Sequence, residues 1–251
     1  MHSEQSMNVS PRGLPDVRRV YQVYAALCAV AAVRFGGPLG GKLVLVGELE
    51  NEGAAMVLAA SIAGGASLAV DTSVDRLKAA IRGGVCDFMV NHLDEAVRIL
   101  KNEIRKKQPV AVGLSGAWET VTGAMAERGV QPDVVAAGDG DAVTLFLERG
   151  AVRLDEDPGE DAGWVDVEWT AERDPAMWLP RADALAAEAL EGKAEDRRRW
   201  LRLAPRYMGR ALRTRRYVRM SKADLERFSE RVKGLTEAGA TVVVSENVAR
   251  D

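Results

Sequence analysis

Three glutamates occupy a turn in which a phosphate-binding chain would carry glycines. Between Gly47 and Gly53, directly after the apolar run LVLV, the sequence places Glu48, Glu50 and Glu52. Glycines in such a turn let backbone amides approach a diphosphate, which the N-terminus of the following helix also attracts. A carboxylate about 5 Å from a phosphate opposes its binding by about 3 kcal/mol at an effective dielectric constant of 20. Two interpretations stay open, a weakened phosphate site and a turn whose glutamates cap the helix, and the charges favour the second.

Paired carboxylates recur further along the chain, in the sequence GDGD. Asp139 and Asp141 follow the apolar run VVAA, where open parallel sheets bind their ligands. Two such carboxylates could hold a divalent cation or act as a general base. The alternative is a solvated turn, which aspartate and glycine favour through their backbone geometry, and we expect the turn. His92 precedes the sequence LDEA and is more typical of a helix start than of a catalytic base.

Composition restricts the class of protein. The chain has 251 residues, 47% of them apolar and 28% charged, and a formal net charge of -3, as in an ordinary globular protein. Cys28 and Cys86 each lie in an apolar run, so we expect buried thiols in a reducing cytoplasm. Two histidines and two cysteines without a cluster predict no zinc site. We expect neither a signal peptide nor a membrane span, because no apolar segment of the required kind occurs.

Helical and strand-like segments alternate through the first 150 residues and would position these side chains. Apolar spacing over residues 17–35 predicts a leading helix. Five apolar runs bounded by turn residues then predict buried strands: KLVLVG, SLAVD, DFMVN, PVAVGLSG and DVVAAG. The segments between them have helical patterns, and Ser73 is a candidate N-cap of one of these helices. The alternation predicts an α/β fold for residues 17–150, a Rossmann-like doubly wound parallel sheet.

The sequence changes character after Gly150, so residues 151–251 form a second part. Ten acidic residues and three arginines lie between Glu148 and Asp174, and we interpret this segment as a linker with one short strand at WVDVEW. Residues 176–233 have helical patterns in two or three pieces, and the final AGATVVVSEN alternates as a strand at a sheet edge would. We therefore expect a C-terminal, mainly helical extension.

Ten arginines and no acidic residue lie between Arg197 and Arg219. On one continuous helix, five of them would share a face: Arg199, Arg202, Arg206, Arg210 and Arg213. Such a face could bind the phosphates of a nucleic acid or nucleotide. It could also be solvated, or paired with the acidic segment 148–174 of its own or a neighbouring subunit, because arginine forks engage carboxylates. The two charge blocks nearly cancel, which favours the second interpretation, and we expect no nucleic-acid partner.

A family resemblance rests on the segment RFGGPLGGKLVLVGELENEGAAMVLAASIAGGASLAVDTSVDRLKAAIRGG. It resembles the NAD-binding domain of urocanase (urocanate hydratase), in which a Phe-Gly-Gly-x-Leu-x-Gly-Lys lead precedes a strand, a Gly-rich loop and an Ala-rich helix. The likeness continues through NHLDEAVRIL, PVAVGLSG and ERGVQPDVV and covers about residues 30–150. It implies a Rossmann-like domain with NAD as its cofactor, and it does not extend to residues 151–251.

The resemblance also implies roles for single positions. The pyrophosphate loop of the family, Gly-Gly-Met-Gly-Gly, corresponds to residues 50–54, of which only Gly53 keeps the motif. An acidic residue that binds the adenosine ribose corresponds to Asp71, and an arginine near the adenine corresponds to Arg76. Trp118 stands where the family has alanine and would crowd the nicotinamide end. The implied cofactor-binding residues are Asn51, Glu52, Gly53, Asp71, Arg76, Ala117, Trp118, Gly138, Asp139 and Gly140.

In urocanase the NAD acts as an electrophile toward the imidazole of the substrate, and most catalytic residues lie on a core domain around this one. No such core precedes the matching segment, so we expect a stand-alone relative with a degraded pyrophosphate loop, not by itself a competent urocanate hydratase. One alternative is a binding or assembly module whose arginine-rich helix engages an acidic partner. Another is the NAD-binding subunit of a two-chain hydratase. The expected partners are an adenosine-containing ligand at Asp71 and Arg76 and a second copy of the chain.

Overall fold

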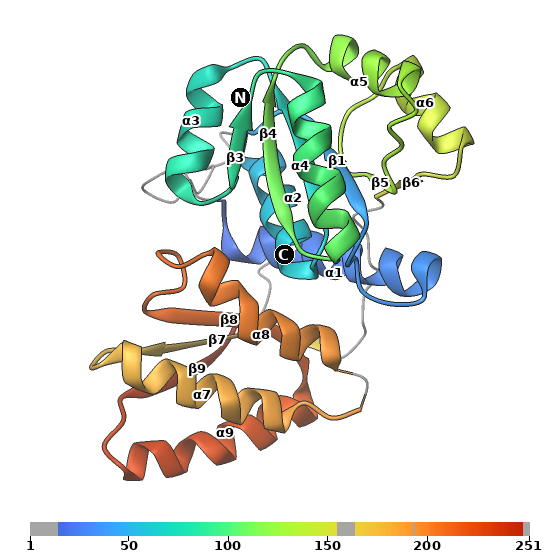
Figure 1. Ribbon diagram of the computed structural model, residues 1–251. Helices are drawn as coiled ribbons and strands as arrows, with labels where there is room; N and C mark the ends of the chain where they lie inside the picture. Colours follow the sequence, from blue (N-terminus) through green and yellow to red (C-terminus); the bar gives the residue numbers. More distant parts are fainter. Residues whose placement is uncertain (1–14, 155–163, 193, 248–251) are drawn as a thin grey trace, which may run out of the picture. The chain divides into compact units, whose positions relative to one another are not determined.

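The computed structural model describes residues 15–154, 164–192 and 194–247 (Figure 1). The chain divides into two compact units, residues 1–156 and 157–251. The described helices are α1 Val17–Phe35, α2 Asn51–Ala63, α3 Val74–Gly83, α4 Leu93–Lys106, α5 Trp118–Glu127, α6 Asp141–Glu148, α7 Pro175–Ala189, α8 Glu195–Tyr207 and α9 Lys222–Glu237. The described strands are β1 Leu43–Val46, β2 Ala66–Asp71, β3 Phe88–Val90, β4 Val110–Ser115, β5 Val134–Val135, β6 Val152–Arg153, β7 Trp164–Ala171, β8 Arg215–Ser221 and β9 Val242–Asn247. No helix in these ranges is long and apolar enough to cross a membrane.

The strands of the first unit form one parallel sheet in the order β3-β4-β2-β1-β5-β6. From β1 the chain moves through β2 out to β3, returns to β4, and then passes beyond β1 to β5 and β6. The direction of winding therefore reverses at β1, which is the feature that defines a doubly wound sheet. This confirms the predicted fold class. The short strand β6 is an addition, because the sequence analysis placed these residues in a linker.

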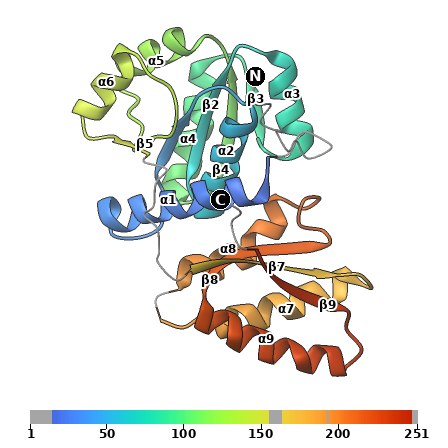
Figure 2. The same ribbon diagram turned by 180° about the vertical axis from the view of Figure 1, so that it is seen from behind.

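Helices cover both faces of this sheet (Figures 1 and 2). On one face, Val112 of β4 belongs to an apolar cluster that includes Leu100 of α4, Met125 of α5 and Phe146 of α6. The next residue of β4, Gly113, faces the opposite side, where a Cβ atom would lie 2.6 Å from the Leu77 side chain of α3. The alternation of side chains along a strand thus separates α4–α6 from α3.

Helix α2 is buried on nearly every side. Eleven of its 13 residues are buried, and they are nearly all small or apolar. A helix of this composition can lie against a sheet on one side and a second helix on the other, and α2 contacts both the sheet and α1. Helix α2 begins at Asn51. Its tight packing therefore also fixes the position of the turn before it, which with Glu48, Glu50 and Glu52 is called the acidic turn below.

Helix α3 begins with the predicted N-cap. The Oγ atom of Ser73 accepts a hydrogen bond from the backbone amide of Arg76 at 3.3 Å, which satisfies one of the amides that a helix start leaves without an intrahelical partner. The cap places Arg76 in the first turn of α3, next to the carboxyl end of β2.

The second unit contains a three-stranded antiparallel sheet in the order β8-β7-β9 together with α7, α8 and α9. Trp169 of β7 is fully buried, and its ring packs edge-on against Phe228 at 4.9 Å between centroids. The indole Nε1–H donates to Asp183 of α7 at 3.1 Å, and Arg216 of β8 donates to the same carboxylate at 2.8 Å. Burial raises the pKa of Asp183 to about 6, against the opposing effect of Arg216. This core ties two strands to a helix, and the unit is the mainly helical extension that the sequence predicts.

The arginine-rich stretch does not form one helix, so the predicted single face is wrong. Helix α8 ends at Tyr207, two residues after Pro205, which lacks an amide donor and disturbs the preceding turn. Arg210 and Arg213 lie in the turn that follows, and β8 then pairs with β7 along its whole length. The backbone pairing of β8 and its buried hydrophobic side chains outweigh the helical spacing of the arginines.

Candidate functional site

The carboxyl ends of β1, β2, β4 and β5 meet at one edge of the parallel sheet. Strands β1 and β5 are neighbours there, and the chain continues from β1 toward β2 but from β5 toward β6, in opposite directions across the sheet. Open α/β sheets bind ligands in the crevice outside such a reversal point. The residues that the resemblance implicates in cofactor binding lie at this edge: Asp71 ends β2, and the others lie in the loops or in the first turns of the helices that follow.

Asp71, the last residue of β2, is the centre of the site. Its side chain is 0% exposed. Its carboxylate accepts hydrogen bonds from the amides of Leu49 at 2.8 Å and Ser73 at 2.6 Å. It also accepts two from Arg76, from Nε and Nη2, each at 2.9 Å. A carboxylate has about four lone-pair positions, so these four donors occupy its whole accepting capacity.

Burial by itself would raise the pKa of the Asp71 carboxyl. The hydrogen bonds from Arg76, Ser73 and Leu49 outweigh that effect and hold the pKa below its ordinary value. The carboxylate is therefore ionised throughout the neutral range, and its negative charge is neutralised by Arg76 of its own chain.

Arg76 also contacts two of the glutamates in the turn after β1. Its Nη1 lies 3.3 Å from Glu50 and its Nη2 lies 3.6 Å from Glu48. One guanidinium thus serves three carboxylates. The hydrogen bonds to Asp71, and then the charges of the two glutamates, raise the pKa of Arg76 above its ordinary value. The two glutamate side chains are more than 60% exposed, so each of these outer pairs adds little to stability. Their consequence is electrostatic, because they leave a net negative charge at the mouth of the crevice.

The turn after β1 contains the positions that correspond to the pyrophosphate loop. Asn51 is the exposed first residue of α2. Glu52 bonds Arg19 of α1 at 2.6 Å. Gly53 is required by the fold, since a Cβ atom on it would lie 1.9 Å from the carbonyl oxygen of Glu48. This glycine therefore brings the turn and the helix into contact with each other, and the space beside it is filled by the chain's own backbone.

The prediction that the glutamates cap α2 is wrong for hydrogen bonding. Glu50 stands at the N-cap position but makes no side-chain capping bond. Its carboxylate turns to Arg76 instead, because an arginine offers a stronger, charge-assisted bond than a backbone amide does. Only Glu52 lies in the first turn of α2, where its charge favours the helix N-terminus.

Trp118 lies at the same edge of the sheet, against the loop that follows β5. It is the first residue of α5, after the exposed Ala117. Its indole Nε1–H donates to the carbonyl oxygen of Asp139 at 2.7 Å. A Cβ atom on Gly138 would lie 2.2 Å from the same ring, and φ at Gly138 is +99°. The loop after β5 is therefore built around this tryptophan.

The rest of that loop is held by an arginine that sequence analysis missed. Arg153 of β6 donates to the carbonyl oxygen of Gly138 at 3.0 Å and to the carboxylate of Asp139 at 2.9 Å. Asp139 thus has a cation of the chain as its partner, and Gly140 is the N-cap of α6, with φ at 122°. In the part of the chain that the structure describes, no group of three or more His, Cys, Asp or Glu side chains could hold a metal ion.

Five of the ten implied residues form two contact groups at this edge. Asp71 and Arg76 are bonded to each other, and Trp118, Gly138 and Asp139 form the second group. The residues that sequence reasoning missed are the arginines at positions 19 and 153, which bind Glu52 and Asp139. Neither lies in a motif, and both reach the site from elements distant in sequence, so no local pattern indicates them.

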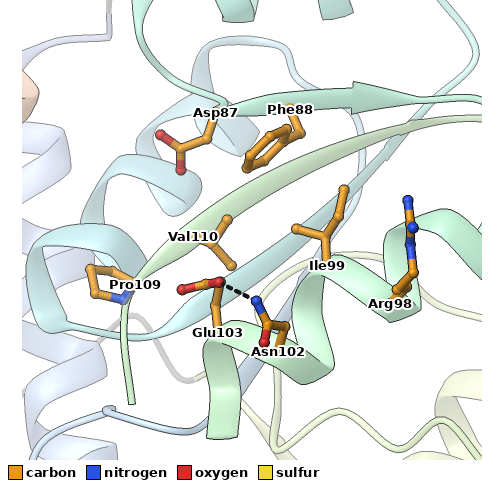
Figure 3. A pocket seen from close by; sticks show the side chains of 8 residues that line it. All are labelled: Asp87, Phe88, Arg98, Ile99, Asn102, Glu103, Pro109 and Val110. Atoms are coloured by element: carbon orange, nitrogen blue, oxygen red, sulfur yellow. Dashed lines mark hydrogen bonds between the residues drawn. The ribbon is translucent and has the colours of Figure 1, made fainter. Parts of the chain in front are cut away.

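An open hollow of about 830 Å³ lies at the opposite end of the strands (Figure 3). Its lining includes Phe88 and Val110, the first residues of β3 and β4, and Ile99, Asn102 and Glu103 of α4. In Figure 3 the Asn102 amide bonds Glu103, and Phe88 lies on the opposite wall. The amino ends of strands are not where doubly wound sheets bind cofactors, so this hollow is separate from the crevice.

Comparison with protein families now places the first unit. Residues 20–139 match the family model described as the urocanase Rossmann-like domain. This segment is similar to the Rossmann-like domain of urocanase. The match begins within α1 and ends in the loop after β5. The matched segment, residues 20–139, is called the urocanase-type domain below, and it includes the acidic turn, the Asp71–Arg76 pair and Trp118. Helix α6, strand β6 and the second unit lie outside it.

Proposed function

We propose that the urocanase-type domain of this chain keeps the family's fold as a scaffold but does not take up NAD at its first crossover. We further propose that this chain by itself does not hydrate urocanate. One observation carries the proposal: the carboxylate that would receive the adenosine ribose already accepts four hydrogen bonds from its own chain, two of them from Arg76.

Displacement of those donors is unfavourable. A ribose that approached Asp71 would have to replace the Arg76 guanidinium or the amides of Leu49 and Ser73. Hydrogen bonds to charged groups contribute about 1.5–3 kcal/mol each, and neutral ribose hydroxyls would not replace the ion pair that Arg76 makes with this carboxylate. If Arg76 swung away, Glu48 and Glu50 would lose the cation that they share. The ribose corner therefore favours its closed arrangement.

Charge in the adjoining turn opposes the diphosphate as well. The domain offers three glutamates there, with Arg19 and Arg76 as their partners, and Arg76 is already neutralised by Asp71. Two phosphate charges would enter a region whose net charge is negative. Repulsion between like charges at such distances is only partly screened by salt.

Space at the nicotinamide side is taken by Trp118. Its ring lies against Gly138, and its indole hydrogen bond to Asp139 joins the loops after β4 and β5. A nicotinamide ring would have to displace this indole and break that hydrogen bond. The residues present do not fit NAD at the ribose, at the diphosphate or at the nicotinamide, and each misfit has its own physical cause.

Thermal unfolding with ligands tests the proposal. Separate samples of the full chain receive NAD, ADP-ribose or adenosine at 1 mM, and the midpoint temperature is recorded. A ligand at about 100 times its Kd stabilises the folded state by about 2.7 kcal/mol, which shifts the midpoint by several degrees. We expect no shift, and no loss of urocanate absorbance over hours. A shift that Asp71→Asn abolishes would contradict the proposal and establish a working ribose site.

A further inference from the structure

The arginine-rich stretch separates into arginines that hold the second unit together and arginines that face solvent. Arg198 of α8 donates to the carbonyl oxygens of Ala187 and Leu190 at the end of α7. Arg216 binds Asp183 and Arg219 lies 3.4 Å from Asp166. These arginines satisfy buried acceptors or pair with carboxylates, so their presence needs no external partner.

Two more arginines have contacts with the unit. The Arg197 guanidinium stacks 3.5 Å from the centroid of the Trp164 ring. The Nε atom of Arg215, the first residue of β8, donates to the carbonyl oxygen of Ala211 at 3.4 Å. This hydrogen bond connects the turn between α8 and β8 to β8. That turn is ordered further by backbone hydrogen bonds from Ala211 and Leu212 to Met208.

Arg199 of α8 is partly buried and has a contact within the chain. Four arginines remain, near the end of α8 and in the turn directly after it: Arg202, Arg206, Arg210 and Arg213. All four side chains are exposed. Within the described ranges, no ion pair or side-chain hydrogen bond engages any of them. Two lie one helical turn apart near the end of α8, about 6 Å along its axis, and two lie in the fastened turn directly after it. We call these four residues the arginine patch.

The surroundings of the patch decide which polyanion it suits. The buried core of a protein–protein interface is enriched in apolar and aromatic residues. The exposed large hydrophobic side chains of the described chain are Val33, Val74, Ile81, Phe88, Met177 and Val243, none of them within residues 197–219. Interfaces with duplex nucleic acid are more polar and more positively charged. The arginine patch therefore has the composition of an interface with duplex nucleic acid.

The aromatic residues of the stretch distinguish a duplex from a single strand. Trp200 is 1% exposed and Tyr217 is 2% exposed, and the Trp200 indole is bonded to the Tyr217 carbonyl oxygen. Neither ring can stack on a nucleobase, and the third aromatic residue of the stretch, Tyr207, is partly buried and has a contact within the chain. Single-strand binding depends on such stacking platforms, whereas contacts to the phosphates of a duplex need only cations at repeated spacing.

From this arrangement we propose that Arg202, Arg206, Arg210 and Arg213 form a docking surface for the phosphate backbone of a nucleic-acid duplex, without base-specific readout. The sequence alone favoured pairing of the whole arginine block with acidic residues. The structure divides the block and leaves these four cations exposed, near the end of α8 and in the turn after it. The arginine fork binds phosphate bidentately, and four contacts give weak, strongly salt-dependent binding.

The test is fluorescence polarisation of a labelled duplex with the full chain between 50 and 200 mM salt. Four phosphate contacts predict a slope of log K against log salt of about -3.6, a loss of about 150-fold over that range. Arg202→Gln/Arg206→Gln and Arg210→Gln/Arg213→Gln should each reduce the slope by about 2. The matched control is Lys101→Gln/Arg105→Gln, an exposed pair at the same spacing on α4, which should change neither slope nor affinity.

Three results would overturn the proposal. The first is no binding at 50 mM salt, or binding that salt does not weaken. The second is an equal loss in the control variant, which would mean that overall charge and not the patch is responsible. The third is competition by polyglutamate as effective as competition by unlabelled duplex, which would assign the patch to an acidic protein. Circular dichroism of each variant verifies that the exposed substitutions leave the fold intact.

Discussion

Neutralising the glutamates of the turn after β1 should restore affinity for a diphosphate ligand. The variant is Glu48→Gln/Glu50→Gln/Glu52→Gln, which keeps side-chain size and removes three negative charges. At about 5 Å, a carboxylate repels a phosphate charge by about 0.8 kcal/mol in water and by about 3 kcal/mol at an effective dielectric constant of 20. These side chains are at least 60% exposed, so the value lies near the lower limit, at about 1 kcal/mol each.

The three substitutions together should therefore favour ADP-ribose by about 3 kcal/mol, a gain of about 10² in affinity. Isothermal titration calorimetry at low salt measures it, and added salt should diminish the gain. The control is Glu95→Gln/Glu127→Gln/Glu148→Gln, three exposed glutamates of the same unit outside the crevice, with the same change in net charge. If both triple variants bind ADP-ribose equally, local repulsion in the turn is refuted as the cause.

Three further predictions concern stability. Asp71→Asn should lower the free energy of unfolding by about 2–4 kcal/mol in urea titrations, because Arg76 and two amides lose a charged acceptor; a loss below about 0.5 kcal/mol would contradict the four-donor description. Burial raises the pKa of Asp183 to about 6, above its value in the unfolded chain. This carboxyl group should therefore make the second unit more stable as the pH falls from 7 toward 4. Asp183→Asn should remove that pH dependence from the unfolding transition monitored by tryptophan fluorescence. Gly138→Ala should destabilise the first unit by at least about 2 kcal/mol more than Gly150→Ala does. Both glycines have φ near +100°, but only Gly138 contacts Trp118. Equal losses of unfolding free energy in the two variants would show that backbone strain alone matters.

Much of the first unit is predictable because its patterns are strong. The leading helix was predicted over residues 17–35, the bounds of α1, since apolar spacing and Gly36 define both its face and its end. The first four strands are apolar runs between glycines or turn residues, and each is found. Helix α6 and strand β6 were missed because they are short and depend on neighbours for their conformation.

The second unit and the site are less predictable for a common reason. Strand β8 is hidden in the sequence by its arginines, whose helical spacing continues past Pro205, and only pairing with β7 selects the strand. The family pattern indicates Asp71 and Arg76 as contacts of the adenosine, and it does not indicate that they bond each other. It does not indicate that Arg76 would also pair with the glutamates of the acidic turn, because that contact depends on how α3 meets the turn after β1 in three dimensions.

The central claim is that the chain's own charges and side chains occupy the crevice in which the family holds its dinucleotide. The most direct measurement denatures the freshly purified full chain and quantifies the released nucleotides by liquid chromatography with mass spectrometry. The account predicts far less than one NAD per ten chains, with no increase after incubation in 1 mM NAD and removal of the excess. Release of about one NAD per chain would contradict it.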